Sequence, residues 1–300
     1  MLNKKLSFKE LIRIAPQYLY PHHLASRLVG WLSRYENEAV KNRLIRRFGK
    51  RYQTDTKEAV SRNLNRYPNL NAFYTRALKQ GVRPITKLEN GIACPADGIV
   101  SQAGRISSGE IIQAKGSTFS VSALLGGESP HAEAYEKGVY ATIVLSPGDY
   151  HRVHMPFNAT LLETVHVPGR LFSVNPLTQK LMPGLYTKNE RVVSFFDSEA
   201  GPMALVMVGS IFSASIETVW DGVITPPTHG DIRHWNYPYN PPPRKKRGRN
   251  GALQYGIDRD LAVCRRQGRL GKRFCGRGPG KGGAVNRQDI NLIIYIINTS

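Results

Sequence analysis

Six short apolar runs between residues 91 and 226 constrain the fold of this chain more than any other feature. They are GIVSQAGRI, VYATIVLS, ATLLETVHV, RVVSFF, MALVMVGSIF and IETVWDGVI, and Gly, Pro, Asn and Asp residues separate them. Runs of this length, rich in β-branched residues and bounded by turn formers, are typical of β-strands. We expect one short helix among them, around FSVSALLGG. These runs predict a largely antiparallel, β-rich domain in a protein of the α+β class.

Residues 7–47 carry a different pattern, in which apolar residues recur at near-helical spacing from Leu11 to Tyr35. Pro16 and Pro21 are expected to break this run. Lys and Arg residues accompany the apolar ones, and a basic, aromatic, amphipathic segment suits the surface of an anionic bilayer. A helical pair packed on its own domain has the same periodicity. The pattern alone leaves both interpretations open.

The chain is strongly basic, and the excess charge is concentrated at one end. Lys and Arg number 42 against 22 Asp and Glu, a net charge of +20. Residues 244–300 contain 14 of those bases, three Asp and no Glu, so +11 of the excess lies in this tail. A large net positive charge by itself indicates a nucleic-acid or anionic-membrane partner. A tail without periodicity or interleaved aromatics, however, is more typical of solvated or disordered chain.

Several classes of protein are excluded by composition. A hydrophobic content of 41% is too high for a disordered chain, and no apolar run is long enough to span a bilayer. The N-terminal residues MLNKKLSFKELIRIAP lack the continuous apolar core of a secretory signal. The three cysteines (Cys94, Cys264 and Cys275) are too few for a disulfide framework, which favours a reducing compartment.

Two segments carry the residues best suited to chemistry. The first is Pro95–Gly98, in which Asp97 precedes a glycine, a pair that ordinarily forms a turn. The second is Tyr150–Pro156, in which His151 and His154 would point to opposite faces of an extended chain. Two such histidines can be acid–base groups, metal ligands or surface residues. No nearby cysteine or third histidine completes a zinc site, so we predict no metal.

Taken together, these and other segments resemble a known family in order and spacing. The segments are PADG, KGSTFSVSALLGG, LSPGDYHRVHMP, PGRLFSVNP, NERVVSFFDSEAGPMALVMVGS and SIETVWDGVITPP. They resemble the bacterial phosphatidylserine decarboxylase proenzyme, a pyruvoyl-dependent family, from the N-terminus to about Tyr239. The resemblance implies a carboxy-lyase that converts phosphatidylserine to phosphatidylethanolamine in phospholipid biosynthesis.

The resemblance also implies a cofactor made from the chain itself. In that family, a serine in a Leu/Met-Gly-Ser-Thr motif attacks the preceding peptide carbonyl. The chain then splits into β and α subunits and leaves a pyruvoyl group, an electron sink comparable to pyridoxal phosphate. By matching motifs, His154 is the base that activates the serine, and Asp97 orients it. His151 would assist with substrate binding or decarboxylation.

The lipid substrate favours the interfacial interpretation of the N-terminus and a division into three parts. Residues 1–60 would form a helical membrane-interface segment, residues 61–240 the β-rich catalytic domain and residues 241–300 an aberrant basic tail. The resemblance implies a peripheral enzyme on the cytoplasmic face of the bacterial inner membrane, with homo-oligomerisation as an option and no nucleic-acid partner. The alternative is a non-catalytic basic protein that binds membranes or nucleic acid.

One element of the family pattern is missing. No Leu-Gly-Ser-Thr or Met-Gly-Ser-Thr occurs in the chain, and Gly116-Ser117-Thr118 lies upstream of the histidine motif, where the family has a substrate-domain segment. Beyond Tyr239, where the family continues to its cleavage motif, the basic tail begins. The tail is therefore predicted to be out of frame and disordered, and the chain as written to be unable to form its pyruvoyl group.

The genetic code offers an explanation for the missing serine. With favourable synonymous codons, the nine residues Asn250–Asp258, read one base later, become Met-Gly-Arg-Phe-Asn-Met-Gly-Ser-Thr. This sequence matches the segment that surrounds the cleavage site in the family. Its serine codon overlaps the codons of Ile257 and Asp258. The hypothesis is a single-base frameshift, either genomic or a sequencing error, near Pro241–Lys246. It also accounts for the absence of Glu from the tail, because GAR codons are read as arginine out of frame.

Overall fold

The computed structural model describes residues 8–298, apart from one long stretch and several short ones. The stretches outside the description are 85–91, 115–116, 128–129, 157, 199, 212–214, 226–229, 238–242, 245–248 and 254–291.

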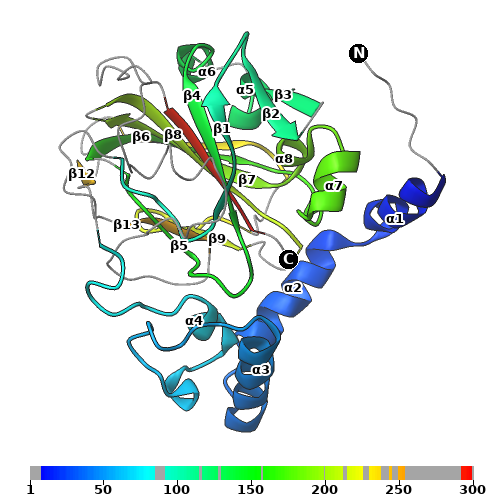
Figure 1. Ribbon diagram of the computed structural model, residues 1–300, viewed down its shortest axis with the longest axis vertical. Coiled ribbons are helices and arrows are strands. Elements are labelled where there is room, and N and C mark those ends of the chain that lie inside the picture. The colour runs from blue at the N-terminus through cyan, green and yellow to red at the C-terminus, as the bar shows by residue number, and fades with distance from the viewer. Residues whose placement is uncertain are drawn as a thin grey trace, which may run out of the picture.

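Three helices lie along one side of the β-rich part of the molecule (Figure 1). They are α1 (Phe8–Leu19), α2 (His22–Ser33) and α3 (Glu38–Arg51). Pro21 separates α1 from α2 as expected, but Pro16 lies inside α1, so the prediction that it breaks the helical run is wrong. The side chain of Asn37 accepts a hydrogen bond from Val40 N and so caps α3. A short helix, α4 (Leu70–Tyr74), connects this region to the sheets.

A large sheet forms the centre of the molecule, with strand order β1-β4-β14-β8-β7-β6-β11 and β12 also paired with β6. The strands are β1 (Ile99–Arg105), β4 (Val139–Leu145), β14 (Leu292–Asn298), β8 (Gly201–Val208), β7 (Arg191–Ser198), β6 (Ala159–Val167), β11 (Arg233–Asn236) and β12 (Pro243–Arg244). Every pair in it is antiparallel except those of β14, which runs parallel to both β4 and β8. The α+β class and the largely antiparallel sheet are therefore confirmed.

Two smaller sheets, four short α-helices and the 3-10 helix η1 (Leu64–Arg66) complete the part of the fold that the structure describes. One sheet has the order β10-β9-β13-β5, and the other pairs β2 with β3. Their strands are β2 (Glu110–Ala114), β3 (Ser117–Ser120), β5 (Arg152–His154), β9 (Ile216–Thr218), β10 (Gly222–Val223) and β13 (Arg249–Leu253). The helices are α5 (Val121–Leu125), α6 (Pro130–Ala134), α7 (Pro176–Leu181) and α8 (Leu185–Lys188). The predicted short helix around FSVSALLGG is α5.

Apolar clusters cover both faces of the large sheet. Val193 and Phe195 of β7 face a cluster that includes Phe119 of β3, whereas Val192 and Phe196 face a cluster that includes Val153 of β5. Successive residues of a strand point to opposite faces, so a strand buried on both faces needs apolar residues at nearly every position. This explains why RVVSFF and MALVMV are continuous apolar runs rather than alternating ones.

The C-terminal tail is partly ordered, contrary to expectation. β12, β13 and β14 are strands, so the prediction of disorder is wrong for these three segments. Residues Leu292–Ile297 are at most 1% exposed, and β14 fills the gap between β4 and β8. An apolar, isoleucine-rich run has strong strand propensity, and insertion there pairs its backbone on both sides. The domain boundaries remain a prediction.

Candidate functional site

The motif segments meet at one edge of the large sheet. β4, β14 and β8 are parallel and end at this edge, and the antiparallel strands β1 and β7 begin there. Asp97 lies two residues before Ile99, which pairs with Val144 near the end of β4. Glu190 precedes Arg191, which pairs with Val208 at the end of β8. Sheet pairing therefore brings together segments that are far apart in the sequence.

The histidine segment continues from the turn after β4 into β5, and both of its histidines are buried. A hydrogen bond of 3.0 Å joins His154 Nε2 to the hydroxyl of Tyr150, and the two rings stack. His151 contacts other groups: its Nδ1 lies 2.9 Å from the carbonyl oxygen of Asp149, and its ring stacks on Tyr74 at 4.0 Å. The two imidazoles thus have separate surroundings, as the extended segment predicts, which suits two different roles.

Asp97 is held by an arginine that sequence reasoning missed. Arg83 Nε donates to both carboxylate oxygens of Asp97 at 3.0 Å, and its Nη2 binds Asp97 Oδ2 at 2.6 Å and Glu58 Oε2 at 2.6 Å. Burial opposes the charged form of Arg83, but the bonds to Asp97 and Glu58 outweigh it and raise the pKa of the guanidinium above its ordinary value. The segment of Asp97 is joined to His154 by the hydrogen bond from His154 N to Pro95 O, 2.8 Å long.

A cavity of about 340 Å³ opens beside these groups. Asp97, Tyr150, Arg76 and Arg83 are among the residues that line it. Arg76 is buried and donates to the carbonyl oxygens of Gly148 and Asp149, which ties the start of the domain to the turn before the histidines. Burial lowers the pKa of Arg76. Tyr150 lies in the motif segment LSPGDYHRVHMP, and Arg76 lies upstream of all the motif segments. Nothing in their spacing indicates a role.

Two motif glycines allow close approach of backbone segments. A Cβ atom on Gly98 would lie 2.6 Å from Val144 O, and one on Gly169 would lie 2.6 Å from both Glu190 N and Lys188 O. Carbon and oxygen atoms, or carbon and nitrogen atoms, that are not bonded do not approach each other this closely. In PADG the glycine therefore admits the neighbouring strand, whereas the sequence alone indicates only a turn.

Cys94 is not suited to be a nucleophile. Its thiol lies 3.4 Å from Ala96 O, and burial raises its pKa to about 12. A cysteine reacts as the thiolate, which is scarce at neutral pH when the pKa is so high. Within the described part of the chain, no group of three or more His, Cys, Asp or Glu side chains is arranged to hold a metal ion.

The described serine of the Gly-Ser-Thr triplet is not at this site. Ser117 begins β3, whose Phe119 belongs to the apolar cluster on the opposite face of the large sheet from Val153. Ser117 is therefore not placed beside the groups of this site to form the pyruvoyl group that the family makes from a serine. The position predicted for that serine in the shifted frame, Ile257–Asp258, lies outside the described residues. The strand that leads toward it, β13, pairs directly with β5, and Arg249 is opposite His154.

A clamped carboxylate lines the cavity, and two buried histidines lie in the segment that follows its Tyr150, at one edge of a β-rich α+β domain. Such groups are suited to acid–base chemistry in an enzyme. The family model of phosphatidylserine decarboxylase matches residues 70–257, and a second model, described as PSD, matches residues 12–53. The chain is 52% identical over 222 residues to the phosphatidylserine decarboxylase proenzyme of Pseudomonas aeruginosa strain LESB58, a stretch covering 74% of this chain and 77% of that protein. It is 52% identical over 221 residues to the proenzyme of Bordetella pertussis, covering 74% of each chain.

This chain belongs to the phosphatidylserine decarboxylase family. The resemblance and the carboxy-lyase class are thereby confirmed, and nothing favours the non-catalytic alternative. The roles of Asp97, His151 and His154 remain predictions.

Proposed function

We propose that this chain is a phosphatidylserine decarboxylase proenzyme that produces phosphatidylethanolamine once its reading frame is restored. The observation that carries the proposal is the pairing of β13 with β5. β13 is the segment that leads, in the shifted frame, to the cleavage-site serine, and β5 contains His154. A serine a few residues beyond β13 is within reach of the histidine segment, as self-processing requires.

In this proposal the buried groups divide the work. His154 takes the proton of the serine hydroxyl, which is a poor nucleophile until a base removes that proton. The Tyr150 hydroxyl, at 3.0 Å from His154 Nε2, orients the imidazole. Asp97, clamped by Arg83, fixes the PADG segment, and this segment holds His154 through the hydrogen bond from His154 N to Pro95 O. His151, stacked on Tyr74, acts on the lipid substrate in the decarboxylation.

The test is the mass of the expressed protein in two forms. The chain as written should remain a single chain of 33.5 kDa. A gene from which one base is removed between the codons for Pro241 and Lys246 should yield two chains, the smaller with an N-terminus blocked to stepwise degradation. An uncleaved product from the restored gene would contradict the proposal. Sequencing across the same codons distinguishes a true frameshift from a sequencing error.

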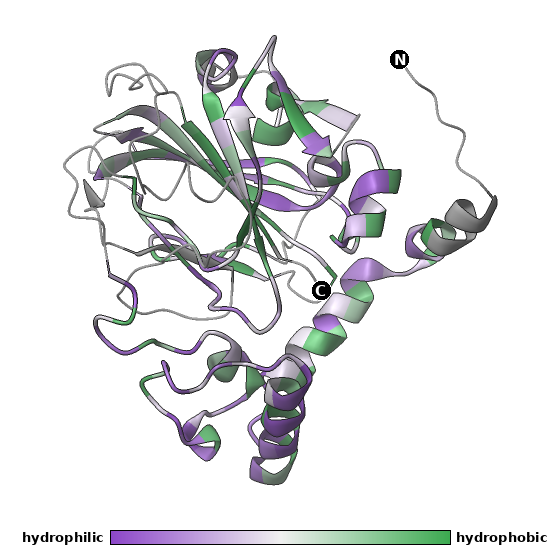
Figure 2. Cartoon of the chain, viewed as in Figure 1, coloured by the Kyte–Doolittle hydropathy of each residue, from purple (hydrophilic) through white to green (hydrophobic). Residues whose placement is uncertain are grey.

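We further propose that α1 and α2 hold the enzyme on the cytoplasmic face of the bacterial inner membrane. Among the described helices, none is long and apolar enough to cross a membrane. α2 nevertheless exposes Leu24, Leu28 and Trp31, each more than 60% accessible and spaced to share one face of the helix. Hydrophobic, green bands recur along this helix in Figure 2. Exposed apolar residues on one face suit a helix that lies in the bilayer interface.

Replacing Leu28 and Trp31 together by Ala should weaken binding to phosphatidylcholine vesicles. The removed apolar surface is worth roughly 2–4 kcal/mol, or about 30-fold or more in the partition coefficient. Co-sedimentation of the full chain measures this change. Val60→Ala, at an exposed apolar residue outside the three helices, is the matched control and should bind as before. Equal binding by the double variant would show that α2 does not dock.

A further inference from the structure

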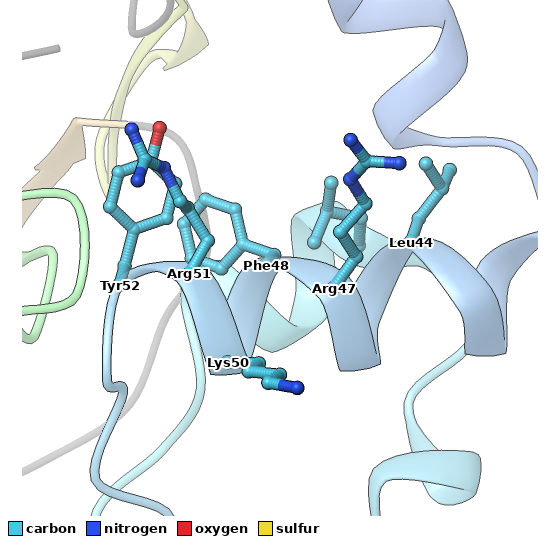
Figure 3. Close-up of a pocket in the computed structure, with 7 residues that line it drawn as sticks. Leu44, Arg47, Phe48, Lys50, Arg51 and Tyr52 are labelled. Atoms are coloured by element: carbon cyan, nitrogen blue, oxygen red, sulfur yellow. The ribbon is translucent and has the colours of Figure 1, made fainter.

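A groove at the C-terminal end of α3 is lined by cationic side chains. These side chains have no role in the candidate active site or in the proposed docking of α2. The volume of the groove is about 630 Å³. Figure 3 shows side chains that line it. We call it the α3 groove. The residues that line it are Leu44, Arg47, Phe48, Lys50, Arg51, Tyr52 and Leu70. Three of these seven are cationic and none is acidic, so the groove is positively charged.

Arg47 and Arg51 form the charged side of the α3 groove. They stand one helical turn apart and rise from the same side of α3 in Figure 3, whereas Lys50 projects from the other side. Like charges at this spacing destabilise a helix. Arg51 lies in the last turn, where the helix dipole favours a cation, but Arg47 lies a turn earlier. Neither arginine has a hydrogen bond or an ion pair within the part of the chain that the structure describes. The pair is therefore available to clamp an anion.

The remaining walls of the α3 groove are apolar and partly exposed. The rings of Phe48 and Tyr52 pack at 4.7 Å, and Leu44 and Leu70 are half-buried beside them. A free inorganic anion gains nothing from such walls. An amphiphile with an anionic head and an apolar tail matches both sides of the groove.

We propose that the α3 groove binds the phosphate headgroup of an anionic membrane phospholipid other than the substrate, with Arg47 and Arg51 as the phosphate ligands. The planar guanidinium forks suit bidentate recognition of phosphate oxygens. α3 follows directly on α2, whose exposed apolar face would lie in the same bilayer. Tyr52 lines both the α3 groove and the cavity beside Asp97, so a lipid bound here would lie next to the catalytic cavity. The inference rests on the membrane docking proposed above.

The experiment compares binding of the full chain to vesicles of phosphatidylcholine alone and to vesicles containing about 20% phosphatidylglycerol, at physiological salt. Arg47→Gln with Arg51→Gln should lower the phosphatidylglycerol-dependent gain in affinity about tenfold or more. The double change to Lys keeps the charge but removes the forks, and should lower that gain several-fold. Arg43→Gln with Arg46→Gln removes the same charge from α3 outside the groove, and should lower it no more than about threefold.

Two results would overturn the inference. One is a Lys double variant that binds phosphatidylglycerol vesicles as the unmodified chain does, because diffuse charge would then suffice. The other is an equal loss for the Arg43/Arg46 and Arg47/Arg51 glutamine variants. Binding to pure phosphatidylcholine should be unchanged in all of these variants, which shows that they are folded. The Leu28/Trp31 variant tests the docking of α2 through binding to pure phosphatidylcholine. The arginine variants test the α3 groove through the gain in affinity that phosphatidylglycerol adds. Failure of one proposal is therefore distinguishable from failure of the other.

Discussion

In a chain with its frame restored, His154→Ala should stop self-cleavage, so that one uncleaved chain accumulates. His154 lies on the strand that pairs with β13, is 2% exposed and is held by Tyr150. Removal of a positioned general base ordinarily slows a reaction about 10²–10⁴-fold. The readout is the fraction of cleaved chain with time, followed by intact mass. Without cleavage no decarboxylation should be detected.

Two further variants make this result specific. Tyr150→Phe removes only the hydroxyl that binds His154 Nε2 and should slow cleavage about tenfold, in line with the loss of one orienting hydrogen bond. His234→Ala is the matched control, because His234 is half-exposed on β11 and pairs with Glu163 away from the site. It should cleave normally. Normal cleavage of the His154 variant would refute its role as the base.

A carboxylate in the centre of β14 should unfold the chain as written. Ile294 is 1% exposed, pairs with Ala141 of β4 and Leu205 of β8, and packs in the cluster that includes Val153. Ile294→Asp would bury a charge without a partner among apolar side chains, at a cost of at least about 3–5 kcal/mol. This is a large part of the stability of an ordinary domain.

The measurement is urea unfolding followed by circular dichroism. Ile294→Val is the matched control, since it removes one methylene group and should cost only about 1 kcal/mol. If the Asp variant unfolds at the same urea concentration as the unmodified chain, β14 is not required in the sheet. In that case β4 and β8 would be stable as edge strands without β14 between them.

Local pattern predicted most of the strands between residues 98 and 224. The runs VYATIVLS, ATLLETVHV and RVVSFF correspond closely to β4, β6 and β7. Strand propensity and turn formers act within a few residues, so a single sequence contains this information. The same reasoning failed for Pro16, because Pro at this place is accommodated within α1. It also failed for β14, whose order depends on two strands more than 80 residues away.

The site was only partly accessible to sequence reasoning. Asp97, His151 and His154 were found because their segments resemble a family, not because spacing implies that they meet. Arg83 and Tyr74 were missed, since an arginine–carboxylate clamp and a ring stack are contacts between distant segments. Tyr150 was missed although it lies in the same segment as His154, because four residues of extended chain give no reason for its hydroxyl to reach the imidazole.

By itself the sequence determined the α+β class, the order of the strands along the chain, the family and the absence of the expected serine motif. These depend on local composition and on the order of motifs. Only the tertiary structure decided which strands are neighbours, that the last strand enters the middle of the sheet and that β13 passes beside His154. The physical reason is that backbone pairing and burial between distant segments depend on the whole sheet, so no short stretch of sequence records them.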